Sequence, residues 1–351
     1  MNVLCVNAGS STLKLAAYDG ERQIAKAQTA DSLREALRAL GPVEPQAVGH
    51  RLVHGGPRHH EPTLIDQPLI ASLRSLIPFA PLHLPKALDA IEEAQRLFPQ
   101  LPQVACFDTH FHWSLPERAK RLPLTQELHD EGVRRYGFHG LSYEFIVAKL
   151  GDNLGRRAVV AHLGNGASLA ALDDGRCVDT TMAFTPAAGI IMGTRTGDLD
   201  PGVALYLLAK GLDLNALERL FERESGLRGI SGVTSDMREL LHGRASDPRA
   251  ALAVEMFALS CRKAIGAFAA VLGGLDTLVF TGGIGENAAE VRADICRGLG
   301  HLGLWLDDAA NAAGTGRIST ARSACTALVV PTDEDLVIAR HTAALVGPSW
   351  R

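Results

Sequence analysis

The chain has 351 residues, of which 46% are hydrophobic and 21% charged, so it is long enough for two globular domains with cores of their own. Its 35 lysines and arginines against 39 aspartates and glutamates give a net charge of −4, which excludes a strongly basic, nucleic-acid-binding protein. No uninterrupted apolar run reaches the roughly 18 residues of a membrane-spanning helix, so we expect neither a nucleic-acid nor a membrane partner.

Runs typical of strands and helices alternate along the chain, which predicts an α/β fold. In order, the first half predicts a hairpin from Val3 to Gly20, a helix over 31–41 that stops at Gly41, a strand over 47–53, a helix over 85–98, a strand over 101–107 and a short helix over 143–150. The second half predicts a hairpin from Val159, long helical regions over 203–224 and 250–272, a buried strand over 275–281, a helix from Ala288, a strand over 327–331 and a closing helix over 335–346.

The six cysteines occur singly and form no C-x-x-C pair. This pattern predicts buried free thiols in a reducing compartment. A strand-like run begins at Val3 with no basic leader before it, so we expect a cytoplasmic protein. The cysteines are Cys5, Cys106, Cys177, Cys261, Cys296 and Cys325.

The first hairpin is echoed by the second. Residues 3–20, VLCVNAGSSTLKLAAYDG, and residues 159–175, VVAHLGNGASLAALDDG, each read as an apolar strand, a turn of small residues, a second apolar strand and an acidic-glycine turn. Small residues let backbone N–H groups approach an anion closely. The echo therefore suggests two halves that grip one polyphosphate, although two ordinary hairpins would give the same pattern.

The segment Thr281–Asn287, TGGIGEN, follows a predicted strand and precedes a predicted helix. Asn287 is a candidate N-cap with Glu290 three residues later, and the glycines would let a flat or anionic ligand approach the backbone. The segment matches neither the dinucleotide fingerprint nor the P-loop pattern. A purely structural turn is the alternative.

Two arginines and two carboxylates lie where ligand chemistry is common. Arg51 and Arg195 stand beside glycine-rich turns, where they could bind carboxylate or phosphoryl oxygens, or else lie on the surface. Asp108 and Glu334 each follow a predicted strand, where they could hold Mg²⁺ or simply cap a turn and a helix.

Thirteen histidines raise the question of a metal site. The pairs His59-His60 and His110/His112 have no cysteine or aspartate partner at zinc spacing, so the sequence does not predict zinc. His139, in a glycine turn beside Phe138, is better placed to donate a hydrogen bond to an anion.

Taken together, these segments resemble the acetate kinase family over nearly the whole chain. The matching blocks are NAGSSTLK (7–14), HRLVHGG (50–56), APLH (80–83), FDTHFH (107–112), RRYGFHG (134–140), HLGNGAS (162–168), FTPAAGIIMGTRTGDLDP (184–201), TGGIGEN (281–287) and TDEDLVIARHT (332–342).

The resemblance implies a fold, a division of the chain into two domains, and a reaction. The fold is α/β, with two ribonuclease-H-like domains of the actin/Hsp70 type and a nucleotide cleft between them. The expected domains are 1–109 plus 336–351, and 110–335. The implied reaction is a reversible, direct transfer of phosphate from ATP to acetate, which gives acetyl phosphate and ADP. Mg²⁺ or Mn²⁺ is the implied cofactor, and a homodimer the implied assembly.

The resemblance also implies residue roles. The residues that the resemblance implies to be catalytic are Arg51, Asp108, His139 and Arg195. The residues implied to bind phosphate and nucleotide are Asn7, Ser10, Thr12, Lys14, His162, Asn165, Gly166, Asp236, Arg238, Gly283, Ile284 and Asn287. Arg51, Val53, Leu82, Phe138 and Pro186 form the implied acid pocket, and Asn7 and Glu334 the metal site. Because a carboxylate substrate is already ionised at neutral pH, Asp108 is better interpreted as organising metal or substrate than as a base.

The sequence departs from the family pattern at four positions: Leu84, Leu141, Tyr143 and His110, the last of which stands where FDTAFH has a small residue. The segment between Lys14 and Arg51 is also short. These departures leave two alternatives open. One is a propionate-preferring kinase of the same family, and the other is a non-catalytic, nucleotide-gated module of the actin/Hsp70 fold.

Overall fold

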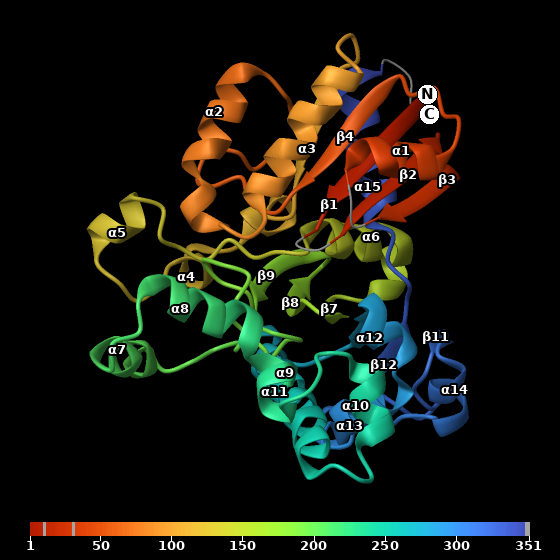
Figure 1. The fold of residues 1–351 in the computed structure, drawn as a ribbon. Coiled ribbons are helices and arrows are strands. Elements are labelled where there is room, and N and C mark those ends of the chain that lie inside the picture. The colour runs from red at the N-terminus through yellow and green to blue at the C-terminus, as the bar shows by residue number, and fades with distance from the viewer. Residues whose placement is uncertain (10–11, 30–31, 348–351) are drawn as a thin grey trace. The chain divides into compact units, whose positions relative to one another are not determined.

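The computed structural model describes residues 1–9, 12–29 and 32–347, which form two compact units, each built on one sheet (Figure 1). The first unit comprises Met1–Trp113, Leu124–Phe145 and the described part of Asp333–Arg351. The second comprises Ser114–Pro123 and Ile146–Thr332. The expected division near residue 110 differs from these units, because residues 110–113, 124–145 and 333–335 pack with the first unit.

The first sheet has six strands in the order β3-β2-β1-β4-β6-β5. β1 runs parallel to β4, and β4 to β6, whereas β2, β3 and β5 are antiparallel to their neighbours. The carboxyl ends of the three parallel strands therefore meet at one edge, where α/β sheets usually bind ligands. The strands are β1 Asn2–Ala8, β2 Leu13–Asp19, β3 Arg22–Thr29, β4 Ala47–Leu52, β5 Thr63–Leu64 and β6 Gln103–Phe107.

Helices cover both faces of this sheet. Leu4 and Val6 of β1 pack into a core shared with the first three helices, while Val3 and Cys5 pack against α15, because successive strand residues point to opposite faces. The helices are α1 Leu33–Leu40, α2 Gln67–Ser75, η1 Ile77–Phe79, α3 Leu84–Leu97, η2 His110–Ser114, α5 Gln126–Asp130, α6 Gly140–Leu150, which continues into the second unit, and α15 Glu334–Val346.

The predicted helix over 31–41 is confirmed as α1, with its local signals in place. The hydroxyl of Ser32 accepts a hydrogen bond from the Glu35 N–H at 3.4 Å and caps the helix start. Gly41 has a φ of +86° and ends it, a conformation that other residues rarely adopt.

The second sheet repeats the topology of the first. Its order is β11-β12-β10-β7-β8-β9, with β7, β10 and β12 parallel and the other strands antiparallel, so each strand has a counterpart in the first sheet. The predicted echo is thus a structural one: β1–β2 corresponds to β7–β8. The strands are β7 Arg157–Leu163, β8 Ala167–Asp173, β9 Arg176–Thr180, β10 Thr277–Thr281, β11 Gly316–Arg317 and β12 Thr326–Val329.

In the second unit, one of the two long predicted helical regions is confirmed and the other is wrong. The region 250–272 is a single helix, α11, but 203–224 is broken, because the chain turns at Gly211, whose φ is +94°. Across the described residues, no helix is both long and apolar enough to span a bilayer. The helices are α4 Glu117–Lys120, η3 Gly151–Leu154, α7 Pro201–Ala209, α8 Leu214–Arg219, the π-helical turn η4 Leu220–Glu224, α9 Gly226–Ser231, α10 Met237–Gly243, α11 Pro248–Leu272, α12 Gly282–Asn287, α13 Ala289–Cys296, η5 Gly300–Leu302 and α14 Asp308–Ala313.

The TGGIGEN segment is a short helix rather than a turn. It forms α12, and its first residue, Gly282, takes a φ of +76° directly after β10. The capping prediction at Asn287 is wrong: its side chain donates to the Gly283 carbonyl at 2.9 Å instead. Glu286 holds the helix start, since its carboxylate accepts from the N–H of Gly282 at 2.9 Å and of Thr332 at 3.3 Å.

Candidate functional site

In the first unit, polar side chains gather at the carboxyl ends of β1, β4 and β6. Arg51 of β4 donates to both carboxylate oxygens of Asp108, which follows β6, at 2.7–3.1 Å. Its Nη1 donates to the amide oxygen of Asn7 in β1 at 3.1 Å and lies 3.4 Å from the carboxylate of Glu334. Two residues expected to be catalytic, Arg51 and Asp108, and the two expected to hold the metal, Asn7 and Glu334, are therefore brought together.

This cluster is largely removed from water, with Asp108 only 1% exposed and Arg51 17%. Burial raises the pKa of the Asp108 carboxyl to about 6, and the guanidinium of Arg51 acts in the opposite direction. Burial alone would lower the pKa of Arg51, but the carboxylates of Asp108 and Glu334 raise it well above its ordinary value. At neutral pH the pair is therefore ionised, and a two-pronged contact fixes the plane of the guanidinium.

His139 is connected to this cluster through a backbone hydrogen bond of the residue that follows it. It has a φ of +58°, a left-handed conformation that is uncommon for a residue with a side chain and that often marks functional positions. The following residue, Gly140, donates its N–H to the carbonyl of Asp108 at 2.8 Å. The start of α6 and the end of β6 are thus tied together at the residues that carry His139 and Asp108.

The start of α15 adds two acids that the sequence reasoning missed. Asp333 caps the helix, accepting from the Leu336 N–H at 3.0 Å, and also accepts from the Tyr18 hydroxyl at 2.8 Å. Asp335 is buried, and its Oδ2 lies 3.7 Å from Nζ of Lys26. The run of three acids at a predicted helix start was the signal that could have identified them.

The first small-residue turn is only partly described. Gly9 donates its N–H to the Thr12 carbonyl at 2.8 Å, and Lys14 lies exposed on β2 opposite Asn7. Ser10 lies outside the described residues. Thr12 also lines a cavity of about 230 Å³ with Lys86, among other residues.

The apolar residues expected to receive a methyl group belong to different units. Val53 and Phe138 are buried and Leu82 half-buried in the first unit. Pro186 belongs to the second, where its carbonyl accepts from Arg195 at 3.3 Å.

In the second unit, the β7–β8 turn supports the loop that carries Arg195. Within the turn, Gly164 donates to the carbonyl of Gly166 at 3.1 Å, with His162 half-buried at the end of β7. The carbonyl of Asn165 accepts from the N–H of Gly193 at 2.9 Å, two residues before Arg195. The structure therefore joins two segments that the sequence placed in one site.

Arg195 has an acidic partner that the sequence did not reveal. Its Nε lies 3.1 Å from the carboxylate of Glu222, and both side chains are mostly buried. Burial raises the pKa of Glu222, while Arg195 opposes that shift. Glu222 lies in the π-helical turn η4, inside the region 203–224 that the sequence predicted as helical, and helical periodicity does not reveal an ion pair with a residue as far back in the chain as Arg195.

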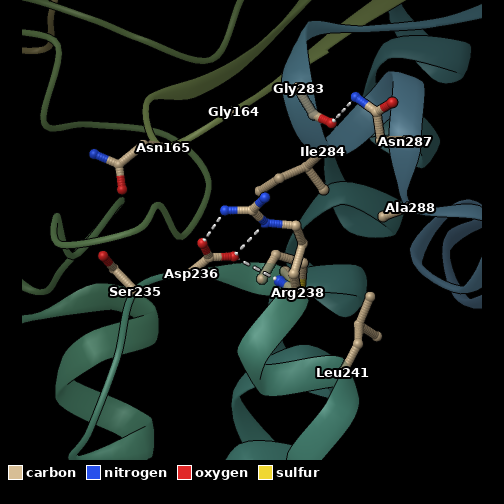
Figure 2. A pocket seen from close by; sticks show the side chains of 11 residues that line it. Gly164, Asn165, Ser235, Asp236, Arg238, Leu241, Gly283, Ile284, Asn287 and Ala288 are labelled. Carbon is tan, nitrogen blue, oxygen red and sulfur yellow. Dashed lines mark hydrogen bonds and ion pairs between the residues drawn. The ribbon is translucent and has the colours of Figure 1, made fainter.

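A pocket of about 710 Å³ opens beside the same β7–β8 turn (Figure 2). Asn165, the start of α10 and the α12 segment line it. Asp236 caps α10 and accepts from the Arg238 guanidinium at 2.7 and 3.2 Å, which holds that flat group beside Ile284 (Figure 2). The volume suits a nucleoside. The lining includes the six residues Asn165, Asp236, Arg238, Gly283, Ile284 and Asn287, all of which the sequence assigned to nucleotide binding.

The chain is similar to known proteins over most of its length. The acetokinase family profile matches residues 21–340. An acetate kinase from Rhodopseudomonas palustris is 52% identical over 303 residues, which cover 84% of this chain and 76% of the relative.

Two crystal structures share the whole fold. One is a propionate kinase from Francisella tularensis, 32% identical with a TM-score of 0.91, covering 98% of this chain and all of that one. The other is the Porphyromonas gingivalis acetate kinase, 34% identical with a TM-score of 0.88, covering 98% and 99% of the two chains.

The duplicated sheet, with a small-residue turn at the first hairpin of each copy, defines the actin/Hsp70-like ATPase fold. Within that fold class, the chain belongs to the acetokinase family.

Proposed function

We propose that this protein is an acetate kinase, which transfers the γ-phosphoryl group of ATP to acetate and runs in both directions. A carboxylate oxygen of acetate forms the new bond to phosphorus, the bond to the β-phosphate oxygen breaks, and ADP leaves. No proton has to be removed from the acid, since acetate is ionised at neutral pH. The observation that carries the proposal is the arginine Arg51, fixed by Asp108 and Glu334 at the ligand-binding edge of the first sheet.

In this mechanism Asp108 positions rather than accepts a proton. Both of its oxygens already accept hydrogen bonds from Arg51, and the pair holds the guanidinium in one plane. Arg51 then binds the acid's carboxylate or the charge that develops on the phosphoryl oxygens. His139 donates a hydrogen bond to the transferring phosphoryl group. Positioning and charge stabilisation of this kind account for most catalysis of phosphoryl transfer.

The second unit supplies the nucleotide contacts. The pocket between Asp236–Arg238 and Gly283–Asn287 takes the adenosine, with the flat Arg238 guanidinium against the base. His162, Asn165 and Gly166 bind phosphate oxygens, and Arg195 stabilises the transferring group. Ser10 and Thr12 of the first turn and Lys14 at the start of β2 bind phosphate.

The oxygen donors of the first unit fit Mg²⁺. Asn7, Asp108, Glu334 and Asp335 offer carboxylate and amide oxygens, the ligands that Mg²⁺ prefers, and Mn²⁺ accepts the same set. Burial raises the pKa of the Asp335 carboxyl, while Lys26 and a hydrogen bond with the Asn7 side chain act in the opposite direction. We assign the ion to Asn7 and Glu334. When bound, it neutralises charge on the β- and γ-phosphates.

Propionate is the second candidate acid, because a propionate kinase shares this fold at 32% identity. Val53, Leu82 and Phe138 of the first unit are the proposed contacts of the acid's methyl group. One further methylene in an apolar pocket changes discrimination by only about 1–3 kcal/mol, so we expect both acids to be used.

We also propose a cytoplasmic homodimer. The six cysteines are buried free thiols, which suits a reducing compartment. None of the residues of α7 is buried, and its Leu205, Tyr206 and Leu208 are 68%, 58% and 47% exposed. An apolar helix face of this kind is typical of a surface that a partner covers.

ADP formation in the presence and absence of acetate tests the proposed function. ATP, Mg²⁺ and the full chain are held constant, and acetate is added across a wide range. We expect the rate of ADP formation to rise with acetate concentration and to saturate. ADP formation that acetate does not change, with nucleotide still bound, would instead support the non-catalytic, nucleotide-gated module.

A further inference from the structure

Three side chains outside the proposed acid and nucleotide sites converge in the first unit. His110 comes from η2, Glu144 from α6 and His341 from α15 (Figure 1 labels α6 and α15). One nitrogen or carboxylate oxygen from each lies within 4.8 Å of the others. His341 Nε2 is 2.7 Å from Glu144 Oε1, and the rings of His110 and His341 meet edge to face at 5.4 Å.

The hydrogen bonds around these residues leave metal-binding atoms available. His110 Nδ1 is 2.6 Å from the carbonyl of His60, which can only accept, so in the neutral imidazole Nδ1 donates and Nε2 is the nitrogen with the lone pair. A histidine whose second nitrogen donates to a backbone carbonyl is the usual arrangement in metal sites.

Two buried atoms in the cluster lack partners. Glu144 Oε2 and His341 Nδ1 are out of contact with water and make no hydrogen bond to any described residue. The contact between His341 Nε2 and Glu144 Oε1 alone leaves both atoms unsatisfied, which is costly away from water. A cation between the three side chains would satisfy the carboxylate.

We propose that His110, Glu144 and His341 bind a divalent transition-metal ion of the Zn²⁺ class, with water completing the coordination. Two imidazoles and one carboxylate are a known zinc donor set, and imidazole nitrogens select against Mg²⁺. The sequence did not predict zinc, because the three ligands come from elements far apart in the chain.

The bound ion would crosslink three segments of the first unit. His110 is two residues after Asp108, Glu144 lies on the helix that begins beside His139, and His341 lies on the helix that begins with Glu334. The metal would therefore connect the three segments that carry these residues. His110 also occupies the position where the family pattern has a small residue, so His110→Ala is a variant that the fold should accept.

Metal binding to tag-free, chelator-stripped full chain tests the proposal. Zn²⁺ and Co²⁺ are titrated without nucleotide and with millimolar Mg²⁺, which occupies oxygen-only sites but competes poorly for imidazoles. We expect one Zn²⁺ per chain with low-micromolar or tighter affinity, visible d–d absorption with Co²⁺, and a raised Tm.

The variants are His110→Ala, His341→Ala and Glu144→Gln, the last of which can still hydrogen-bond to His341 without carrying charge. Each should weaken Zn²⁺ binding by roughly tenfold or more and remove the metal-dependent rise in Tm. His301→Ala, at an exposed histidine of the second unit, is the matched control and should bind as the parent does. A parent chain that binds no Zn²⁺, or His110→Ala and His341→Ala variants that bind it unchanged, would overturn the proposal.

Discussion

Arg51 is the residue on which the proposed chemistry depends most. Its contacts to Asp108, Asn7 and Glu334 involve all three guanidinium nitrogens, come from three separate segments and leave one N–H of Nη2 to donate to a substrate oxygen. The sequence singled out Arg51 beside a glycine-rich turn and Asp108 and Glu334 after strands, and the resemblance added Asn7. It could not reveal that Asp108 pairs with Arg51, because that contact depends on the parallel register of β4 and β6.

Replacement of Arg51 tests this role. We expect Arg51→Ala to lower kcat/KM for the acid by on the order of 10³-fold or more, as losing a charge-stabilising arginine does in other phosphoryl-transfer enzymes. Arg51→Lys should recover little, since an ammonium cannot make the two-pronged contact. Arg74→Ala, at an exposed arginine of the same unit, is the control. Steady-state rates within about tenfold of the parent for a folded Arg51→Ala protein would remove Arg51 from the mechanism.

His112 illustrates a buried histidine with a structural role. It is 1% exposed, its Nε2 lies 2.9 Å from the Phe138 carbonyl, and burial lowers its pKa from 6.5 to about 4. The unfolded chain therefore takes up this proton at a higher pH than the folded one does. Stability should be intact above pH 6.5 and fall as pH drops toward 4.

Denaturant unfolding across pH 7 to 4 measures that loss. A pKa shift of this size lowers the free energy of unfolding by roughly 3 kcal/mol between neutral pH and pH 4. We expect His112→Gln, which can still donate to the carbonyl but does not titrate, to show a shallower decline. Identical slopes for the two proteins would mean that His112 does not contribute to acid sensitivity.

At the scale of elements, the hairpins and the central strands could be predicted because apolar runs between glycine turns are local signals. The TGGIGEN segment could not. Its glycines favoured a turn, but Glu286 binds the N–H groups of Gly282 and Thr332 and so holds the segment as helix α12. Thr332 lies far along the chain, and a contact of that kind leaves no periodic pattern.

The packing of α15 on the first sheet depends on Gly49 in β4. A Cβ at this position would run into Thr342 and Ile338 of α15, although the backbone itself is unstrained. We expect Gly49→Val to destabilise the first unit by about 1–3 kcal/mol and to displace the helix that carries Glu334.

Thermal unfolding and hydrogen exchange measure this effect. Gly266→Ala in α11 is the control, because an added Cβ there meets no atom within 4 Å and alanine favours a helix. An unchanged Tm and unchanged exchange protection in α15 for Gly49→Val would contradict the packing argument.

At the scale of the whole molecule, the chain is a duplication of one sheet topology, and each copy carries part of the candidate chemistry. The echo between residues 3–20 and 159–175 predicted this repeat, since matching hairpins begin matching sheets. The division between the units was harder to predict, because Leu124–Phe145 returns to the first unit without any shift in composition.

The exposed face of α7 leads to an expectation about assembly. If this face is covered in a homodimer, a charge within it should separate the protomers, because an unpaired charge cannot be buried cheaply. We expect Leu205→Glu to shift the mass measured by light scattering from dimer to monomer, with Leu252→Glu, at an exposed leucine of α11, as control. A parent chain that is monomeric at micromolar concentration would contradict the proposed dimer.

Acyl phosphate formation is the most direct test of the proposed transfer. The full chain is incubated with ATP, Mg²⁺ and acetate, propionate or butyrate, and the product is trapped with hydroxylamine as a hydroxamate. We expect hydroxamate from acetate in equal amount to ADP, a smaller or comparable yield from propionate, and little from butyrate. ADP without hydroxamate from any acid, or no turnover by a chain that still binds ATP, would contradict it.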